Sequence, residues 1–413
     1  TFLVLGQYQS AAEQAERAAG IYTTELGAGH ERTLEQRTHH ALAISELGDY
    51  RRAEQELAAV EALYRESQGE NALSTAQATA RHAAMLYHLG DFTGMAAEME
   101  RSLSVARAVP PESREEFEQI LNGAAAACVT RGDHARAVEL FEESIGMLRA
   151  GDQGPDRYLA QTLANLATCF LWQHQPELAE PLLLEAVEMQ RLLFPDGHME
   201  LAMTLQALVG LWHSRGEIEG AREVAVEALE MCRATLPAGH PILAESLYLL
   251  ATLEYRREDY ESAERLLREA VAIRDRHAGE APVQTFDAKN LLALTLSATE
   301  RYEEAAELYR QILPALEDAY PPYDLRENVS PELGKTGVRY DAGRTFRSIG
   351  RHTEAEPLLI LAFEGYSAAL GPGSPQAQKA VRELIEIQTS LGRVEAADAW
   401  RAKLVAPSVD PEN

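Results

Sequence analysis

Four histidines in the first quarter of the sequence are the side chains best suited to metal or acid–base chemistry. They are His39, His40, His82 and His88, and His82 follows His40 by one period of the repeat described below. A zinc site needs three or four ligands that converge at about 2 Å, and no HExxH motif or paired cysteine accompanies these histidines. We therefore predict hydrogen-bonded structural histidines and no metal site.

The three cysteines, Cys128, Cys169 and Cys232, show no sign of an activated nucleophile. Their number is odd and no CxxC spacing occurs, so neither a disulfide framework nor a zinc knuckle is indicated. Cys128 and Cys169 lie in apolar segments, where a thiol behaves as a small hydrophobic side chain. The sequence therefore predicts no catalytic residue, no enzyme activity and no cofactor. Cysteines without a disulfide framework also indicate a reducing, cytoplasmic environment.

The charge and hydropathy of the chain argue against two classes of partner. The 413 residues carry a formal net charge of −27, and a phosphate backbone would repel such a surface. No apolar run reaches the length of about 18 residues that marks a transmembrane helix. We expect a protein or peptide partner, and neither nucleic acid nor a membrane.

These side chains must be positioned by a repeat. A turn signal that reads Gly-Asp-aromatic in its fullest form recurs with a 42-residue period, with one slip of eight. Five residues after its first member stands an alanine in every copy except one, which has Met95. A register held this long indicates a repeat array. The turns begin at residues 6, 48, 90, 132, 174, 216, 258, 300, 350 and 392.

The seventh copy shows what one unit contains. Between residues 242 and 257, Leu243 and Leu247 belong to an apolar stripe with the spacing of one helix face. A second such run spans about 262–276, after the turn. Each unit is therefore a helix hairpin, with helix A before the turn and helix B after it. Because neither helix can bury its apolar stripe alone, the hairpins must stack in an all-α fold.

Small and aromatic residues at fixed distances from the turn relate this unit to a known family. The seventh copy has Ala251 seven residues before the turn, Tyr260 two after it, Ala263 five after it and Ala270 twelve after it. This set resembles the tetratricopeptide repeat. The 42-residue period and loops such as 236–241 resemble the longer form found in kinesin light chains and many bacterial multidomain proteins. The resemblance covers nearly the whole chain and implies a right-handed superhelical solenoid of about ten hairpins, the first truncated.

The repeat register divides the chain into four segments. We expect repeats one to eight in 1–320, an irregular insertion in 321–340, repeats nine and ten in 341–405, and a polar tail in 406–413. The insertion carries the slip of eight residues. Pro314, late in helix B of repeat eight, should kink or end that helix.

The family resemblance also points to a binding groove. In this family helix A lines the concave face through the positions thirteen, ten, six, three and two before the turn. Those positions in this sequence carry amides, aromatics and a few cations, which suit an extended peptide, although polar groups there can also simply face water. Kinesin-light-chain-like repeats often place asparagine ten before the turn. The partner-binding candidates are Asn122, Asn165, Gln206, Tyr248, Tyr255, Arg256, Asn290, Tyr340, Arg344 and Arg347.

The C-terminal end of this expected groove is basic in an otherwise acidic chain. The cations there are Arg344, Arg347, Lys379 and Arg382. They would suit an anionic peptide or a C-terminal carboxylate, held by charge-assisted hydrogen bonds. The alternative is ordinary ion pairing with three acidic neighbours, Asp341, Glu383 and Glu386.

The expected function is a non-catalytic scaffold that holds a peptide or partner segment along the concave face. A surface already ordered by the stack lowers the entropic cost of binding. One alternative is a regulatory or sensor region of a larger bacterial enzyme, such as a serine/threonine kinase or an NTPase-type signalling protein, which a start in mid-repeat would fit. The other is a self-assembling structural array. The polar tail after Lys403 resembles a cap and favours a monomer, although the oligomeric state stays open.

Overall fold

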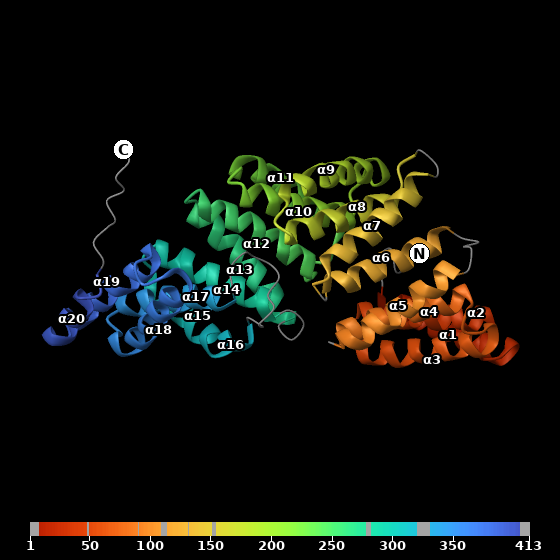
Figure 1. The fold of residues 1–413 in the computed structure, drawn as a ribbon, viewed down its shortest axis with the longest axis horizontal. Coiled ribbons are helices and arrows are strands. Elements are labelled where there is room, and N and C mark those ends of the chain that lie inside the picture. The colour runs from red at the N-terminus through yellow and green to blue at the C-terminus, as the bar shows by residue number, and fades with distance from the viewer. Residues whose placement is uncertain are drawn as a thin grey trace. The chain divides into compact units, whose positions relative to one another are not determined.

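The computed structural model describes residues 8–47, 49–89, 91–108, 114–130, 132–150, 154–277, 282–319 and 331–404. Every regular element in these ranges is a helix, as Figure 1 shows. The expectation of an all-α repeat solenoid is therefore confirmed. No helix in the described part of the chain is long and apolar enough to cross a membrane.

The chain divides into two compact units, Thr1–Thr204 and Leu205–Asn413. Their boundary falls within α10 (Met199–Ser214). The repeat register runs through this boundary without a break, so the sequence does not indicate the division.

The first unit begins with a helix B and continues with complete A–B hairpins. Each helix from α1 to α8 packs against the next one along the chain. The helices are α1 (Tyr8–Leu26), α2 (Glu31–Glu46), α3 (Tyr50–Gln68), α4 (Leu73–His88), α5 (Phe92–Ala108), α6 (Arg114–Thr130), α7 (His134–Arg149), α8 (Arg157–Trp172) and α9 (Pro176–Leu193).

The second unit repeats the same hairpin, and its helices A provide the candidate site. Two short 3-10 turns, η1 (Asp275–His277) and η2 (Leu313–Ala315), extend helices B. The α-helices are α11 (Ile218–Thr235), α12 (Pro241–Arg256), α13 (Tyr260–Arg274), α14 (Pro282–Ala298), α15 (Tyr302–Ile312), α16 (Leu316–Ala319), α17 (Pro331–Ser348), α18 (His352–Leu370), α19 (Pro375–Ser390) and α20 (Val394–Arg401).

The recurring turn is a left-handed helix end followed at once by a helix start. Gly132 and Gly216 have φ values of 76° and 79°, a conformation that glycine adopts without steric cost. Glu258 takes the same conformation at 62° in a copy without glycine. The next residue is the N-cap of helix B, and in this copy Asp259 caps the helix by accepting a hydrogen bond from the Ser262 amide at 3.1 Å. The triplet therefore fixes the angle between helices A and B.

The alanine five residues after the start of the turn lies where helix B meets its neighbours. Ala137, Ala221 and Ala263 are fully buried, with no exposed surface. A side chain this small lets the helix backbones approach closely, and a larger one would have to displace packed atoms. The repeat of small residues is thus explained by helix packing.

Ion pairs connect successive helices B at a regular spacing in the sequence. Arg149 pairs with Glu185 at 2.8 Å in the first unit, and Arg233 pairs with Glu269 at 2.6 Å in the second. The side chains are about half exposed, so each pair contributes little on its own. Their recurrence shows that the acidic surface of helices B is partly neutralised from repeat to repeat.

The end of repeat eight departs from the register as its prolines require. The α-helix of α15 ends at Ile312, two residues before Pro314, which confirms that this proline ends the helix. The expected irregular insertion at 321–340 is wrong over 331–340, because α17 already begins at Pro331. A proline in the first turn of a helix lacks only an amide that would have no helical partner there. Residues 320–330 lie outside the described part of the chain.

Candidate functional site

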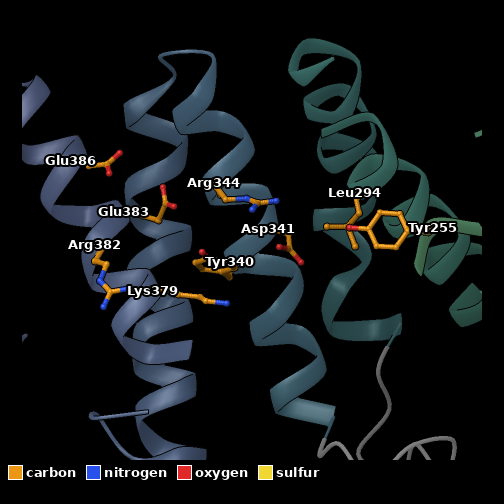
Figure 2. Close-up of a pocket in the computed structure, with 9 residues that line it drawn as sticks. All are labelled: Tyr255, Leu294, Tyr340, Asp341, Arg344, Lys379, Arg382, Glu383 and Glu386. Atoms are coloured by element: carbon orange, nitrogen blue, oxygen red, sulfur yellow. The ribbon is translucent and has the colours of Figure 1, made fainter. Parts of the chain in front are cut away.

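A pocket of about 570 Å³ lies across three consecutive helices A of the second unit, α14, α17 and α19, with one further residue from α12 (Figure 2). Its lining is mainly charged and aromatic. The lining residues are Tyr255, Leu294, Tyr340, Asp341, Arg344, Lys379, Arg382, Glu383 and Glu386.

The repeat register explains why these residues meet. Leu294 and Arg344 both lie six residues before a turn, and Tyr340 and Arg382 both lie ten before one. Equivalent positions on stacked helices A share one face, so residues one repeat apart in sequence become neighbours. Of the groove candidates, the pocket brings together Tyr255, Tyr340 and Arg344.

The two glutamates on one wall of the pocket, Glu383 and Glu386, both form ion pairs with a single arginine. The Arg347 guanidinium pairs with Glu383, and its Nη1 lies 2.7 Å from Glu386 Oε2. Burial raises the pKa of Glu383, and the charge of Arg347 opposes that effect. Arg347 therefore acts as a partner for pocket glutamates and not as a free cation.

The remaining three cations of the pocket are unpaired. Arg344, Lys379 and Arg382 form no ion pair with any residue that the structure describes. The alternative of ordinary ion pairing thus holds for Arg347 and fails for the other three. The pocket lining carries three cations and three carboxylates, so its charges balance although the chain as a whole has a net charge of −27.

Asp341 also lacks a partner for its carboxylate. The side chain makes no hydrogen bond or ion pair with the described residues, although it lies on α17 between Tyr340 and the Leu294–Tyr255 side of the pocket (Figure 2). Burial raises its pKa to about 6, while the positive charges of Arg344 and Lys379 act in the opposite direction. Titratable groups with strongly shifted pKa values concentrate at functional sites.

Tyrosines from four helices surround this carboxylate. Burial raises the pKa of Tyr309 and of Tyr366, the latter to about 12, and the charge of Asp341 adds to both shifts. The rings of Tyr340 and Tyr366 pack edge to face, with centroids 6.3 Å apart. The aromatic surroundings explain why the Asp341 carboxylate is poorly solvated.

Two of the other groove candidates are used between neighbouring helices A. The amide nitrogen of Asn122 donates to Thr162 Oγ1 at 2.8 Å. The amide nitrogen of Gln206 donates to Ser246 Oγ at 2.7 Å and to the Ile242 carbonyl at 3.0 Å. These two bonds repeat one pattern, from ten before one turn to twelve before the next, so part of the amide row stabilises the stack.

The remaining candidates lie apart from the pocket lining. Tyr248 stacks with Arg274, whose guanidinium carbon is 4.8 Å from the ring centroid. Arg256 is exposed and Asn165 is partly buried. Asn290 lies one helical turn from Leu294, and its side-chain oxygen is buried without a hydrogen bond from the described residues. A buried amide oxygen without a hydrogen bond costs free energy, which a partner that reaches it would recover.

Four pocket residues were not predicted as binding groups. Leu294 is an ordinary apolar residue in sequence, and Asp341, Glu383 and Glu386 were expected only as counter-ions. The available signal was positional, since Asp341 and Glu383 both lie nine residues before a turn, beside the ten-before row. Sequence alone does not show that Asp341 is left unpaired.

Two of the four candidate histidines, His40 and His82, have the hydrogen-bonded structural role that the sequence predicts, whereas the side chain of His88 lies outside what the structure describes. His40 Nδ1 lies 2.7 Å from Glu56 Oε2, and His82 Nδ1 lies 2.8 Å from Glu61 Oε2. The hydrogen bond to Glu61 raises the pKa of His82, against the effect of burial. The structure shows no group of three potential metal ligands within the described residues.

Helix hairpins repeated in a constant register, with a pocket on helices A of the second unit, define a helical repeat protein. Models of the tetratricopeptide repeat family match residues 208–276 and 285–320. These two segments are therefore tetratricopeptide repeats, and the same register continues on both sides of them. No curated protein matches it at a significant level.

Solved structures of similar fold span most of the chain. The apo form of the quorum sensor NprR from B. thuringiensis is 14% identical, with a TM-score of 0.56 over 92% of this chain and 97% of that one. A Rap protein complexed with Competence and Sporulation Factor is 17% identical, with a TM-score of 0.54 over 90% and 96%. A STAND protein with a tetratricopeptide repeat sensor from Pyrococcus horikoshii is 14% identical, with a TM-score of 0.59 over 91% and 52%. At these identities the likeness concerns the fold alone.

Proposed function

We propose that this protein is a non-catalytic interaction scaffold that binds a peptide, or an extended segment of a partner protein, along the helix A face of its second unit. The observation that carries this proposal is the pocket across α14, α17 and α19, which presents unpaired cations beside tyrosine rings. Hydrogen-bonding and aromatic groups on a rigid surface suit peptide recognition. The absence of a nucleic-acid partner is proposed from the net charge of −27.

The pocket residues take different roles in this proposal. Tyr255 and Tyr340 provide contact area with little side-chain entropy to lose. Arg344, together with Lys379 and Arg382, provides charge-assisted hydrogen bonds to the partner. Arg347 contacts no ligand directly and instead neutralises the pocket glutamates Glu383 and Glu386.

The other groove candidates extend this surface beyond the pocket. Asn290 would donate and accept through an amide whose oxygen has no described partner. Tyr248 and Arg256 lie on α12, the helix A two repeats before α17. Asn122, Asn165 and Gln206 are proposed as weaker contacts, because two of these three amides already bond to the next helix A.

A second candidate function is the sensor region of a larger signalling enzyme. It is favoured by the fold likeness to the Pyrococcus horikoshii STAND protein, in which 91% of this chain corresponds to 52% of that one. Both functions place the ligand on helices A. They differ in whether ligand binding changes the activity of another domain.

Selection of a random peptide library on the immobilised full chain tests the proposal. Selected peptides should lose at least about tenfold in affinity for a Tyr340→Ala, Arg382→Gln variant, because an aromatic contact and a charge-assisted bond are both removed. Arg233→Gln, on the outer helix α11, is the matched control and should bind as the wild type does. Peptides that bind the groove variant as tightly as the wild type would contradict the proposal.

A further inference from the structure

The charges of the pocket are separated in a way that restricts its ligand. The unpaired carboxylate of Asp341 lies towards α14, beside Leu294 and Tyr255. The unpaired cations Lys379 and Arg382 come from α19, on the other side of Tyr340 (Figure 2). A ligand that crosses α17 meets a negative group at one end and positive groups at the other.

A ligand of a single charge sign fits this arrangement poorly. A purely anionic segment would bring negative charge towards Asp341, which is already poorly solvated. A purely cationic segment would face Lys379 and Arg382. A ligand with one charge of each sign would satisfy both walls, since ionic groups out of water are stable only when they are paired.

We propose that the pocket binds the C-terminus of a peptide that ends in a basic residue, with the terminal carboxylate on Lys379 and Arg382 and the basic side chain against Asp341. This inference rests on the proposed peptide-binding function and specifies its ligand class.

The two tyrosines that line the pocket support the assignment. A guanidinium or ammonium group that reaches Asp341 from the α19 side passes Tyr340 and comes to lie beside Tyr255, and aromatic rings attract cations. Arg344 lies on the same helix as Asp341 and lines the same pocket, but forms no ion pair with this carboxylate. A volume of about 570 Å³ is within the range of pockets that take small ligands, and it suits one terminal residue and part of the next.

Binding of the basic side chain should depend on the ionisation of Asp341. The groups that act on this carboxylate come from five helices: Tyr255, Tyr309, Tyr340, Arg344, Tyr366 and Lys379. Because burial raises the pKa of Asp341 to about 6, the carboxylate is ionised at pH 7.5 and mostly protonated at pH 5.0. Affinity for the basic peptide should therefore fall over this interval.

Calorimetry with three synthetic probes tests the ligand class. The first probe is acetyl-Gly-Ser-Gly-Ser-Arg with a free carboxylate. The second has a C-terminal carboxamide, and the third has citrulline, the neutral isostere of arginine, in place of arginine. The first should bind about tenfold or more tightly than either of the others at pH 7.5, because each change removes one charge-assisted interaction. Lowering the pH to 5.0 should weaken the first probe more than the citrulline probe.

Two variants test which pocket residues cause the preference for arginine and which cause the preference for the free carboxylate. Asp341→Asn should abolish the preference for arginine over citrulline and keep the preference for the free carboxylate. Lys379→Gln combined with Arg382→Gln should do the reverse. Asp196→Asn and Arg265→Gln, which change the same charges on exposed side chains outside the pocket, should keep both preferences.

The outcomes separate this inference from the broader proposal. Equal binding of the arginine and citrulline probes, or an arginine preference that survives in Asp341→Asn, would overturn the assignment of ligand class. The ligand class would also be wrong if library peptides bind at the pocket but none of the three probes does. In that case the proposed peptide-binding function would still stand. If no peptide of any kind binds there, the proposed function fails as well.

Discussion

Asp341 should destabilise the second unit at neutral pH. Its carboxyl has a usual pKa of 3.8 and a folded-state pKa of about 6. Between these values the folded protein binds more protons than the unfolded chain, so stability falls as the pH rises, and above about pH 6 the full penalty applies. A difference of about two pKa units corresponds to about 3 kcal/mol, and because the group borders an open pocket we expect about 1–3 kcal/mol.

Replacement of Asp341 by asparagine keeps the shape of the side chain and removes its charge. We therefore predict that Asp341→Asn stabilises the helices around the pocket by about 1–3 kcal/mol at pH 7.5. The gain should shrink as the pH falls towards 4, where the folded-state carboxyl of the wild type is protonated and carries no charge. Most single substitutions destabilise a protein, so the sign alone is informative.

Hydrogen–deuterium exchange of the full chain, read by mass spectrometry, measures this effect locally. Repeat arrays open in parts, so the amides of α14, α17 and α19 report the relevant free energy better than a single global transition does. Comparing variant and wild type at the same pH cancels the intrinsic pH dependence of exchange. Slower wild-type exchange at pH 7.5, or a difference that is equal at pH 7.5 and pH 5.0, would refute the reasoning.

Three further predictions concern the framework. The hydrogen bond to Glu61 raises the pKa of His82, so this bond stabilises the fold fully below about pH 6.5. The stabilisation is lost as the pH rises through the folded-state pKa of His82. The Tm difference between wild type and His82→Gln should therefore narrow from pH 6 to pH 8.5. Ala263→Leu should cost roughly 1–3 kcal/mol in chemical unfolding, since the site is fully buried, and an unchanged midpoint would mean that helix packing there is misjudged. Arg233→Gln should change stability by less than about 1 kcal/mol, because its pair with Glu269 is about half exposed, and a larger loss would show that the outer ion pairs act together.

Much of the fold could be predicted from the sequence because its determinants are local. The turn triplet specifies a left-handed residue and a helix cap within three positions, and the conformations at Gly132 and Asp259 follow that chemistry. The end of α15 before Pro314 is equally local. The start of α17 at Pro331 was not predicted, because proline is compatible with both an irregular loop and the first turn of a helix.

The sequence predicts which face of the helix stack carries the candidate site, but not which polar groups pair within it. The register places Tyr340 and Arg344 on the same side of the stack. The pairing of polar groups depends on the distances between side chains that lie a whole repeat apart in the chain. The sequence alone does not give those distances. Asn122 is engaged by Thr162, whereas Asp341 has three cations and two glutamates on its own pocket lining and pairs with none of them.

Photo-cross-linking tests the central claim of a peptide groove on helices A most directly. A library-selected peptide with a benzophenone side chain would be bound to the full chain, irradiated and mapped by mass spectrometry. The account predicts cross-links in α14, α17 and α19, and their loss in the presence of the unlabelled peptide. Cross-links confined to the outer helices α13, α15 and α18 would contradict it.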